Sequence, residues 1–175
     1  MNYVNELIGI VGEKNVRTDE IERLCYSRDL SVHEAVPDVV VFVTSTEEVS
    51  KIMFLASKEK IPVTPRGSGT SAVGSALAAK GGILLDLSRM NHILEIDKEN
   101  GYVLVEPGVI CNQLNAAVAP THFFPPDPGS ANLASLGGMV STNASGNRAL
   151  KYGTTKNYVL GLEVVLADGR IINTG

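Results

Sequence analysis

The chain has 175 residues, of which 44% are hydrophobic and 19% are charged, and its formal net charge is −4. This composition excludes a disordered tail, a collagen-like repeat and a coiled coil. The excess of acidic side chains argues against a nucleic acid or an anionic membrane as partner. The sequence shows no apolar run of membrane-spanning length and no signal-peptide pattern, so we expect a cytoplasmic protein with reduced Cys25 and Cys111.

Residues 1–36 are predicted to form a polar N-terminal preface with two short helices. Apolar residues recur at helical spacing over 4–11. A second helix is expected over 18–26, with Thr18 or Asp19 as its N-cap.

Residues 37–90 are predicted to form a small strand–helix–strand lobe. The segment 39–43 is β-branched and apolar on both faces, which is typical of a buried parallel strand. A Ser-x-x-Glu capping box at 45–48 then starts a helix. Further strands are expected over 61–64 and 82–87.

Residues 91–175 are predicted to form a second, mostly antiparallel lobe. Its expected elements are a hairpin over 93–97 and 102–106, a helix over 110–119, an irregular segment over 121–152, and a second hairpin over 160–167 and 170–172. No helix follows the last strand to cover it, so we expect this lobe to be incomplete.

The first candidate site is the glycine-rich segment that runs from Pro65 to Gly74, directly after a predicted strand. Its glycines permit positive φ angles and a close approach to another group. Successive N–H groups in such a loop can bind an anion, and the hydroxyls and Arg66 add further donors. The segment therefore suits a pyrophosphate, with an ordinary glycine-rich turn as the alternative.

The same segment also allows a different nucleotide site. Gly67, Gly69 and Ala72 satisfy the spacing of the dinucleotide-binding fingerprint, and Asp86 follows at a strand end. That fingerprint normally opens a long helix, whereas the residues over 73–75 make a poor first turn. A Rossmann NAD domain is therefore the less favoured interpretation. The sequence has no P-loop motif, which excludes a P-loop nucleoside triphosphatase.

The second candidate site is the segment over 124–146, which is rich in Pro, Gly, Ser and Asn. Gly137 and Gly138 lie where a helix would begin, so we expect free N–H groups there. The small side chains would leave room for a large flat group, and a loop-rich surface is the alternative. The three histidines are not at metal-ligand spacing, so we expect no metal site.

Several motifs in order carry a family resemblance. They lie over 65–71, 126–128, 137–146, 152–153 and 164–169. Over about residues 20–175, the chain resembles the N-terminal part of an FAD-linked oxidase of the vanillyl-alcohol-oxidase type. Within that group it is most similar to the branch of the glycolate oxidase flavoprotein subunit and the FAD-dependent D-lactate dehydrogenases.

The resemblance implies an α+β fold, the bipartite PCMH-type FAD-binding fold, in an apparently truncated form. It implies an FAD-binding domain over 37–175, made of a βαβ lobe over 37–90 and an incomplete second lobe over 91–175, with the pyrophosphate held where the lobes meet. The residues implied in cofactor binding are Pro65, Arg66, Gly67, Ser68, Gly69, Thr70, Ser71, Gly74, Pro128, Gly137, Gly138, Ser141, Asn143, Ser145, Gly146 and Gly153.

The resemblance also implies a flavin-dependent oxidation of a small 2-hydroxy acid, such as glycolate or D-lactate, by hydride transfer to flavin N5. Many relatives carry a histidine that bonds to the flavin where this chain has Thr70, so non-covalent FAD is expected. The relatives' catalytic residues belong to a substrate domain, so none can be assigned here, and the chain alone is expected to be inactive and to hold FAD weakly or not at all. A stand-alone nucleotide-binding module without redox activity is the alternative.

Overall fold

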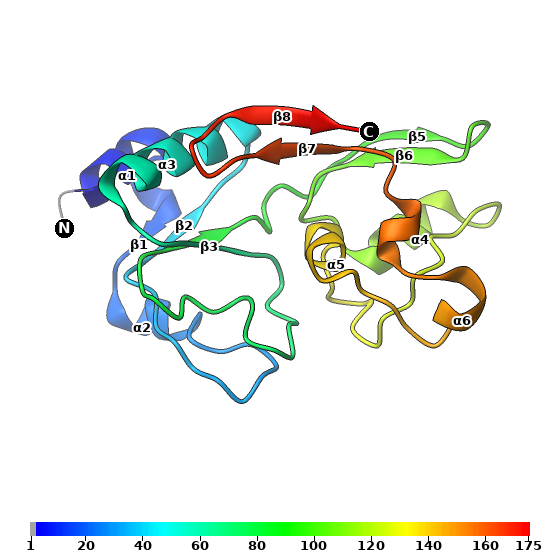
Figure 1. Ribbon diagram of the computed structural model, residues 1–175, viewed down its shortest axis with the longest axis horizontal. Helices are drawn as coiled ribbons and strands as arrows, with labels where there is room; N and C mark the ends of the chain where they lie inside the picture. Colours follow the sequence, from blue (N-terminus) through cyan, green and yellow to red (C-terminus); the bar gives the residue numbers. More distant parts are fainter. Residues whose placement is uncertain (1–2) are drawn as a thin grey trace. The chain divides into compact units, whose positions relative to one another are not determined.

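The computed structural model describes residues 3–175, which divide into two compact units (Figure 1). Unit 1 contains the residues up to Arg89 together with Gly161–Gly175, and unit 2 contains Met90–Leu160. Both units combine helices with strands, in agreement with the predicted α+β class. No helix within residues 3–175 is long and apolar enough to cross a membrane.

A four-stranded sheet forms the centre of unit 1. Its strands are β1 (Val16–Arg17), β2 (Val39–Phe42), β3 (Val63–Arg66) and β4 (Ile83–Asp86), in the order β1-β2-β4-β3. The strand β4 pairs in parallel with both β2 and β3, while β1 is antiparallel to β2. All four residues of β4 are buried, because an apolar strand in the middle of a parallel sheet is covered on both faces. This sheet places the ends of β3 and β4 beside each other.

The helical elements of unit 1 are α1 (Tyr3–Val11), the 3₁₀ turn η1 (Glu13–Asn15), α2 (Glu20–Leu24) and α3 (Thr46–Glu59). Two of these helices, α2 and α3, begin at predicted caps. The Ser45 hydroxyl accepts a hydrogen bond from the N–H of Glu48, and the Asp19 carboxylate caps α2 in the same way. The Glu48 carboxylate accepts from the N–H of Thr44 rather than from that of Ser45, so the capping box is one residue wider than predicted.

The second predicted hairpin consists of β7 (Leu162–Val165) and β8 (Ile171–Thr174), which Figure 1 shows alongside α3. The Ser50 hydroxyl on α3 donates to the carbonyl of Gly169 over 2.6 Å. The Thr46 hydroxyl donates to the Glu163 carboxylate, also over 2.6 Å. The sequence placed this hairpin in the second lobe, but these contacts with α3 group it with unit 1.

Unit 2 is built around one apolar cluster. Its elements are the hairpin β5 (Ile93–Asp97) and β6 (Tyr102–Val105), the helices α4 (Cys111–Val118), α5 (Leu136–Thr142) and α6 (Ala149–Tyr152), and the 3₁₀ turn η2 (Thr155–Tyr158). The buried cluster consists of Val109, Cys111, Leu114, Val118, Ala134, Leu136 and Met139. The helix α5 begins beside Gly137 and Gly138, where a helix start was expected. The helix α6 lies in the segment predicted to be irregular, because its surroundings show little helical periodicity.

Candidate functional site

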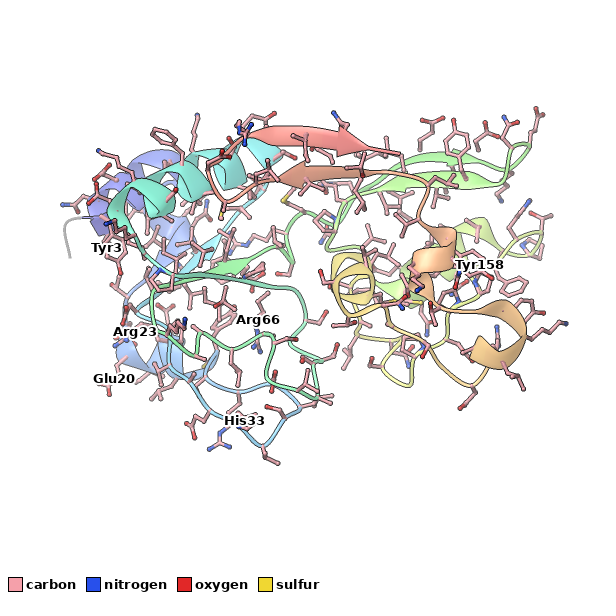
Figure 2. All side chains as sticks on the ribbon, in the orientation of Figure 1. Tyr3, Glu20, Arg23, His33, Arg66 and Tyr158 are labelled. Atoms are coloured by element: carbon pink, nitrogen blue, oxygen red, sulfur yellow. The ribbon has the colours of Figure 1, made fainter. Side chains whose placement is uncertain are left out.

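Arg66, which is labelled in Figure 2, is the last residue of strand β3 and lies near the start of the glycine-rich segment of unit 1. Its side chain is buried, with only 9% of the residue surface exposed. The Nη1 group donates to the carbonyl of Ala76 over 3.2 Å, and the Nη2 group donates to the carbonyl of Arg28 over 2.9 Å. The guanidinium also lies 5.6 Å from the ring centre of Tyr26. The sequence predicted that Arg66 would face a pyrophosphate, yet these contacts tie it to protein groups.

Two glycines of this segment have the positive φ angles that the sequence predicted. Gly69 has φ +68° and Gly74 has φ +75°. A Cβ atom on Gly69 would lie 2.2 Å from Nη2 of Arg66, and one on Gly74 would lie 3.2 Å from Cδ2 of His33. Both glycines are therefore required by the backbone turn and by neighbouring side chains of unit 1.

Several backbone N–H groups of the same loop have no hydrogen-bond acceptor among the residues that the structure describes. Within residues 3–175, the N–H groups of Gly69, Thr70 and Ala72 donate to no protein acceptor, and neither does the Thr70 hydroxyl. The Ser71 hydroxyl, in contrast, accepts from the N–H groups of Val73 and Ser75. A loop that presents several unpaired N–H groups favours an anion, so the donor set fits the diphosphate of a dinucleotide.

The start of α5 differs from the prediction of free N–H groups. The N–H of Leu136 donates to the carbonyl of Val109, and the N–H of Gly137 donates to the carbonyl of Pro107, each over 2.8 Å. A Cβ atom on Gly137 would lie 2.7 Å from Cβ of Pro107. The prediction was wrong for Gly137, because the segment between β6 and α4 already satisfies its amide. Gly138 is exposed, and a Cβ atom there would meet its nearest neighbour at 3.1 Å, farther away than at Gly137.

The segment after α5 is held from two sides. The Asn143 side chain accepts from the N–H of Lys156 over 3.0 Å, and the Thr155 hydroxyl donates to the carbonyl of Ala144 over 2.7 Å. A Cβ atom on Gly146 would lie only 1.9 Å from the carbonyl oxygen of Asp127. This close backbone contact explains the glycine without any ligand.

The other predicted residues of unit 2 also have protein partners, with one exception. The Ser141 hydroxyl donates to the carbonyl of Gly137 over 2.9 Å, and the Pro128 carbonyl accepts from the N–H of Ala131. Gly153 has φ +82° at the end of α6. Ser145 is exposed, and it has no hydrogen-bond partner among the residues that the structure describes. Its hydroxyl therefore stays available to a ligand.

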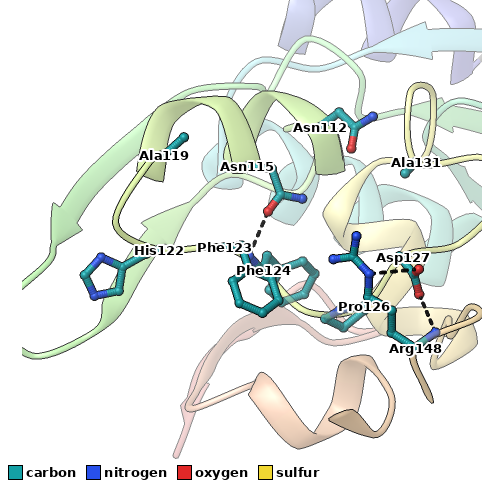
Figure 3. A pocket seen from close by; sticks show the side chains of 10 residues that line it. All are labelled: Asn112, Asn115, Ala119, His122, Phe123, Phe124, Pro126, Asp127, Ala131 and Arg148. Atoms are coloured by element: carbon teal, nitrogen blue, oxygen red, sulfur yellow. Dashed lines mark hydrogen bonds and ion pairs between the residues drawn. The ribbon is translucent and has the colours of Figure 1, made fainter. Parts of the chain in front are cut away.

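A pocket of about 320 Å³ opens on unit 2 (Figure 3). In it, the Asn115 side chain accepts from the N–H of Phe124 over 2.7 Å, and Nε of Arg148 lies 3.4 Å from a carboxylate oxygen of Asp127. None of the sixteen predicted cofactor residues lines this pocket. Nearby, burial and the charge of Asp127 raise the pKa of the Cys111 thiol, which makes this thiol a poor nucleophile.

A larger pocket of about 730 Å³ opens on unit 1 beside α1, α3 and the turn at Gly169. It is rimmed by charged side chains, including those of Glu6 and Lys58, and it also contains none of the predicted cofactor residues. Within residues 3–175, no group of three or more His, Cys, Asp or Glu side chains is placed to hold a metal ion.

One part of the candidate site was not predicted from the sequence. The N–H of Leu30 donates to the carbonyl of Ser71 over 3.0 Å, so the segment around Leu30 lies against the glycine-rich loop. This segment has no apolar periodicity. Its one local signal is an Asx turn, in which the Asp29 carboxylate accepts from the N–H of Ser31 over 2.8 Å. An Asx turn reveals a bend and does not reveal what the bend contacts.

Two kinds of comparison with known proteins identify relatives of this chain. A family model described as "FAD binding domain" matches residues 37–175. The chain is 42% identical over 172 residues to the glycolate oxidase subunit GlcD of Bacillus subtilis (strain 168), covering 97% of this chain and 37% of that protein. It is 43% identical over 159 residues to the D-lactate dehydrogenase of Anaerostipes hadrus, covering 90% of this chain and 33% of that protein. The chain therefore spans about a third of the length of these relatives.

A solved structure shows the same fold. The structure of p-cresol methylhydroxylase with substrate bound superposes with a TM-score of 0.84 at 26% identity, covering 99% of this chain and 35% of that one. This similarity confirms the predicted PCMH-type fold. Since the family match extends over most of the sequence, we conclude that the chain belongs to the family of FAD-binding domains.

Proposed function

We propose that this chain is the FAD-binding part of a flavin-dependent oxidoreductase that oxidises a small 2-hydroxy acid. The observation that carries the proposal is the loop after β3, whose N–H groups at Gly69, Thr70 and Ala72 have no protein acceptor within residues 3–175. The family match over 37–175 supports FAD as the group that uses these donors. Bound FAD would supply the redox chemistry by accepting a hydride from the substrate carbon at flavin N5.

The two units are proposed to hold different parts of the cofactor. The loop of unit 1 binds the diphosphate, because unpaired N–H groups stabilise negative charge. The residues of unit 2 proposed to follow the ribityl chain and the flavin ring are Pro128, Gly137, Gly138, Ser141, Asn143, Ser145, Gly146 and Gly153. Of these, Gly138 and Ser145 are the most open to a ligand, since both are exposed.

The proposed substrate class is taken from the names of two relatives. One similar protein is a glycolate oxidase subunit and another is a D-lactate dehydrogenase, and both of these substrates are small 2-hydroxy acids. The relatives contain further residues, so the groups that bind the substrate and accept its proton are proposed to lie outside this chain. The chain by itself is therefore expected to show no turnover.

The cofactor proposal is tested by calorimetric titration of the flavin-free protein, isolated from its source cells so that any residues beyond this chain are present, with FAD, FMN and NAD. We expect FAD to bind more tightly than FMN, because the loop donors require a diphosphate and FMN carries a single phosphate. We expect NAD to bind more weakly than FAD, because NAD carries a diphosphate but lacks the flavin ring proposed to lie against unit 2. Binding of NAD but not of FAD would contradict the proposal and would favour the Rossmann interpretation.

The linkage between protein and flavin is a separate prediction. Thr70 has no imidazole with which to form a covalent bond to the flavin ring. After acid precipitation of the FAD-loaded chain, we expect all of the flavin in the supernatant, measured by its visible absorbance. Flavin that stays in the washed pellet would show a covalent bond elsewhere.

The substrate proposal is tested on the flavoprotein isolated from its source cells, so that any residues beyond this chain are present. Under anaerobic conditions we expect glycolate or D-lactate to bleach the visible absorbance of the bound flavin, because the flavin accepts the hydride. Ethanol, which lacks the carboxylate, is the matched control. A flavin that neither acid bleaches would contradict the substrate class.

Gly69→Val tests whether the loop is the diphosphate site. The valine would be strained at φ +68°, and its Cβ would displace Arg66, so the open amides would move. We expect FAD affinity to fall about tenfold or more, which corresponds to about 1.4 kcal/mol. Gly101→Val is the matched control, because Gly101 has φ +72° but open space around it. Gly69→Ala serves if the valine variant does not fold. Unchanged FAD affinity in both Gly69 variants would mean that the loop is only a turn.

A further inference from the structure

The segment Ser27–Ala35, here called the strap, is a closed loop that precedes the part matched by the family model. The N–H of Ala35 donates to the carbonyl of Ser27 over 2.9 Å and closes its base. The N–H of His33 donates to the Ser31 hydroxyl over 3.1 Å and orders its tip. The strap is therefore structured by its own hydrogen bonds.

The strap lies against the glycine-rich loop Gly67–Ser75 at several points. The N–H of Leu30 donates to the carbonyl of Ser71 over 3.0 Å. Nη2 of Arg66 donates to the carbonyl of Arg28 in the strap, while Nη1 of the same guanidinium donates to Ala76, just after the loop. One buried side chain thus joins the strap to the loop.

The charge of Arg66 is balanced within this assembly. Burial opposes ionisation of Asp29 in the strap, but hydrogen bonds from Ser31 and Ala76 and the charge of Arg66 outweigh it, so the pKa of Asp29 is lowered. The Arg28 side chain forms its own ion pair with Glu34, also in the strap. The guanidinium of Arg66 is therefore neither free nor uncompensated.

We propose that the strap is part of the cofactor site and that Arg66 is a positioning residue, not a ligand of the diphosphate. Arg66 holds the strap against the loop and so keeps the open N–H groups in place before the ligand arrives. Ordering the loop in advance lowers the conformational cost of binding. This inference rests on the proposed function. It extends the FAD site beyond the residues matched by the family model.

The role of Arg66 is tested with Arg66→Lys and Arg66→Met, measured by FAD titration. Lysine keeps the charge, but it lacks the planar fork that reaches two carbonyls at once. If Arg66 positions the loop, both variants lose about tenfold or more in affinity. If Arg66 binds phosphate through its charge, the lysine variant stays within about threefold of the wild type, which would overturn the proposal. Arg170→Met, an exposed charge loss in the same unit, is the control and should change nothing.

The strap itself is tested by hydrogen exchange of peptides that cover the strap and the loop. Coupling between sites is reciprocal, so if the strap supports FAD binding, then FAD must stabilise the strap. We expect FAD to slow exchange in both segments of the wild type, and we expect Arg66→Lys to speed exchange in both segments without FAD. Protection of the loop alone would overturn the inference and leave the proposed function intact. Absence of FAD binding to the wild type would overturn the proposed function, and this inference with it.

A second pair of variants covers the case in which the Arg66 variants do not fold. Leu30→Pro removes the N–H that donates to Ser71, while Leu30→Ala keeps it, and the Leu30 side chain is 69% exposed. We expect the FAD affinity of the proline variant to be about fivefold or more below that of the alanine variant, which keeps the N–H. Equal FAD affinities in the two variants would overturn the role of the strap.

Discussion

The buried guanidinium of Arg66 is the interaction on which the candidate site of unit 1 depends. A charged group removed from water is tolerated only where hydrogen bonds and compensating charge surround it. Here the carbonyls of Arg28 and Ala76 and the nearby carboxylate of Asp29 fill that role. Arg28 and Asp29 lie in the strap, whereas Ala76 lies just after the glycine-rich loop. The hydrogen bonds of the guanidinium therefore hold the strap, the loop and the end of β3 together. The unpaired N–H groups of the loop depend on that arrangement.

The glycines of the two candidate segments serve the protein's own packing more than the sequence suggested. Gly69 makes room for Arg66, Gly137 lies against Pro107, and Gly146 lies against the backbone of Asp127. Small residues in such loops let one backbone approach another, and a ligand needs the same property. The amino-acid composition of a loop cannot show whether its glycines serve backbone packing or ligand binding. Where the structure leaves donors without protein partners, as at Thr70 and Ser145, the case for a ligand is stronger.

Much of the local structure follows from short-range physics and was predicted closely. The strand after residue 38, the helix that begins after Ser45, and the hairpin over 93–105 were expected within about one residue of their observed bounds. Each has a signal that acts within a few residues: a β-branched run, a hydroxyl cap, or an Asn-Gly turn. The strand that ends at Arg66 was expected two residues too early, because Pro65 obscured its end.

The sequence by itself determined most of the elements and the family of FAD-binding domains, and it indicated the loop after β3 as the candidate diphosphate site. The tertiary structure alone decided that β4 lies between β2 and β3, that the last hairpin packs with α3, and that the strap meets the loop. It also decided that the amide of Gly137 is already paired with Pro107. These features depend on hydrogen bonds between residues far apart in the chain. No pattern of neighbouring side chains encodes such partners, because they exist only once the backbone has folded.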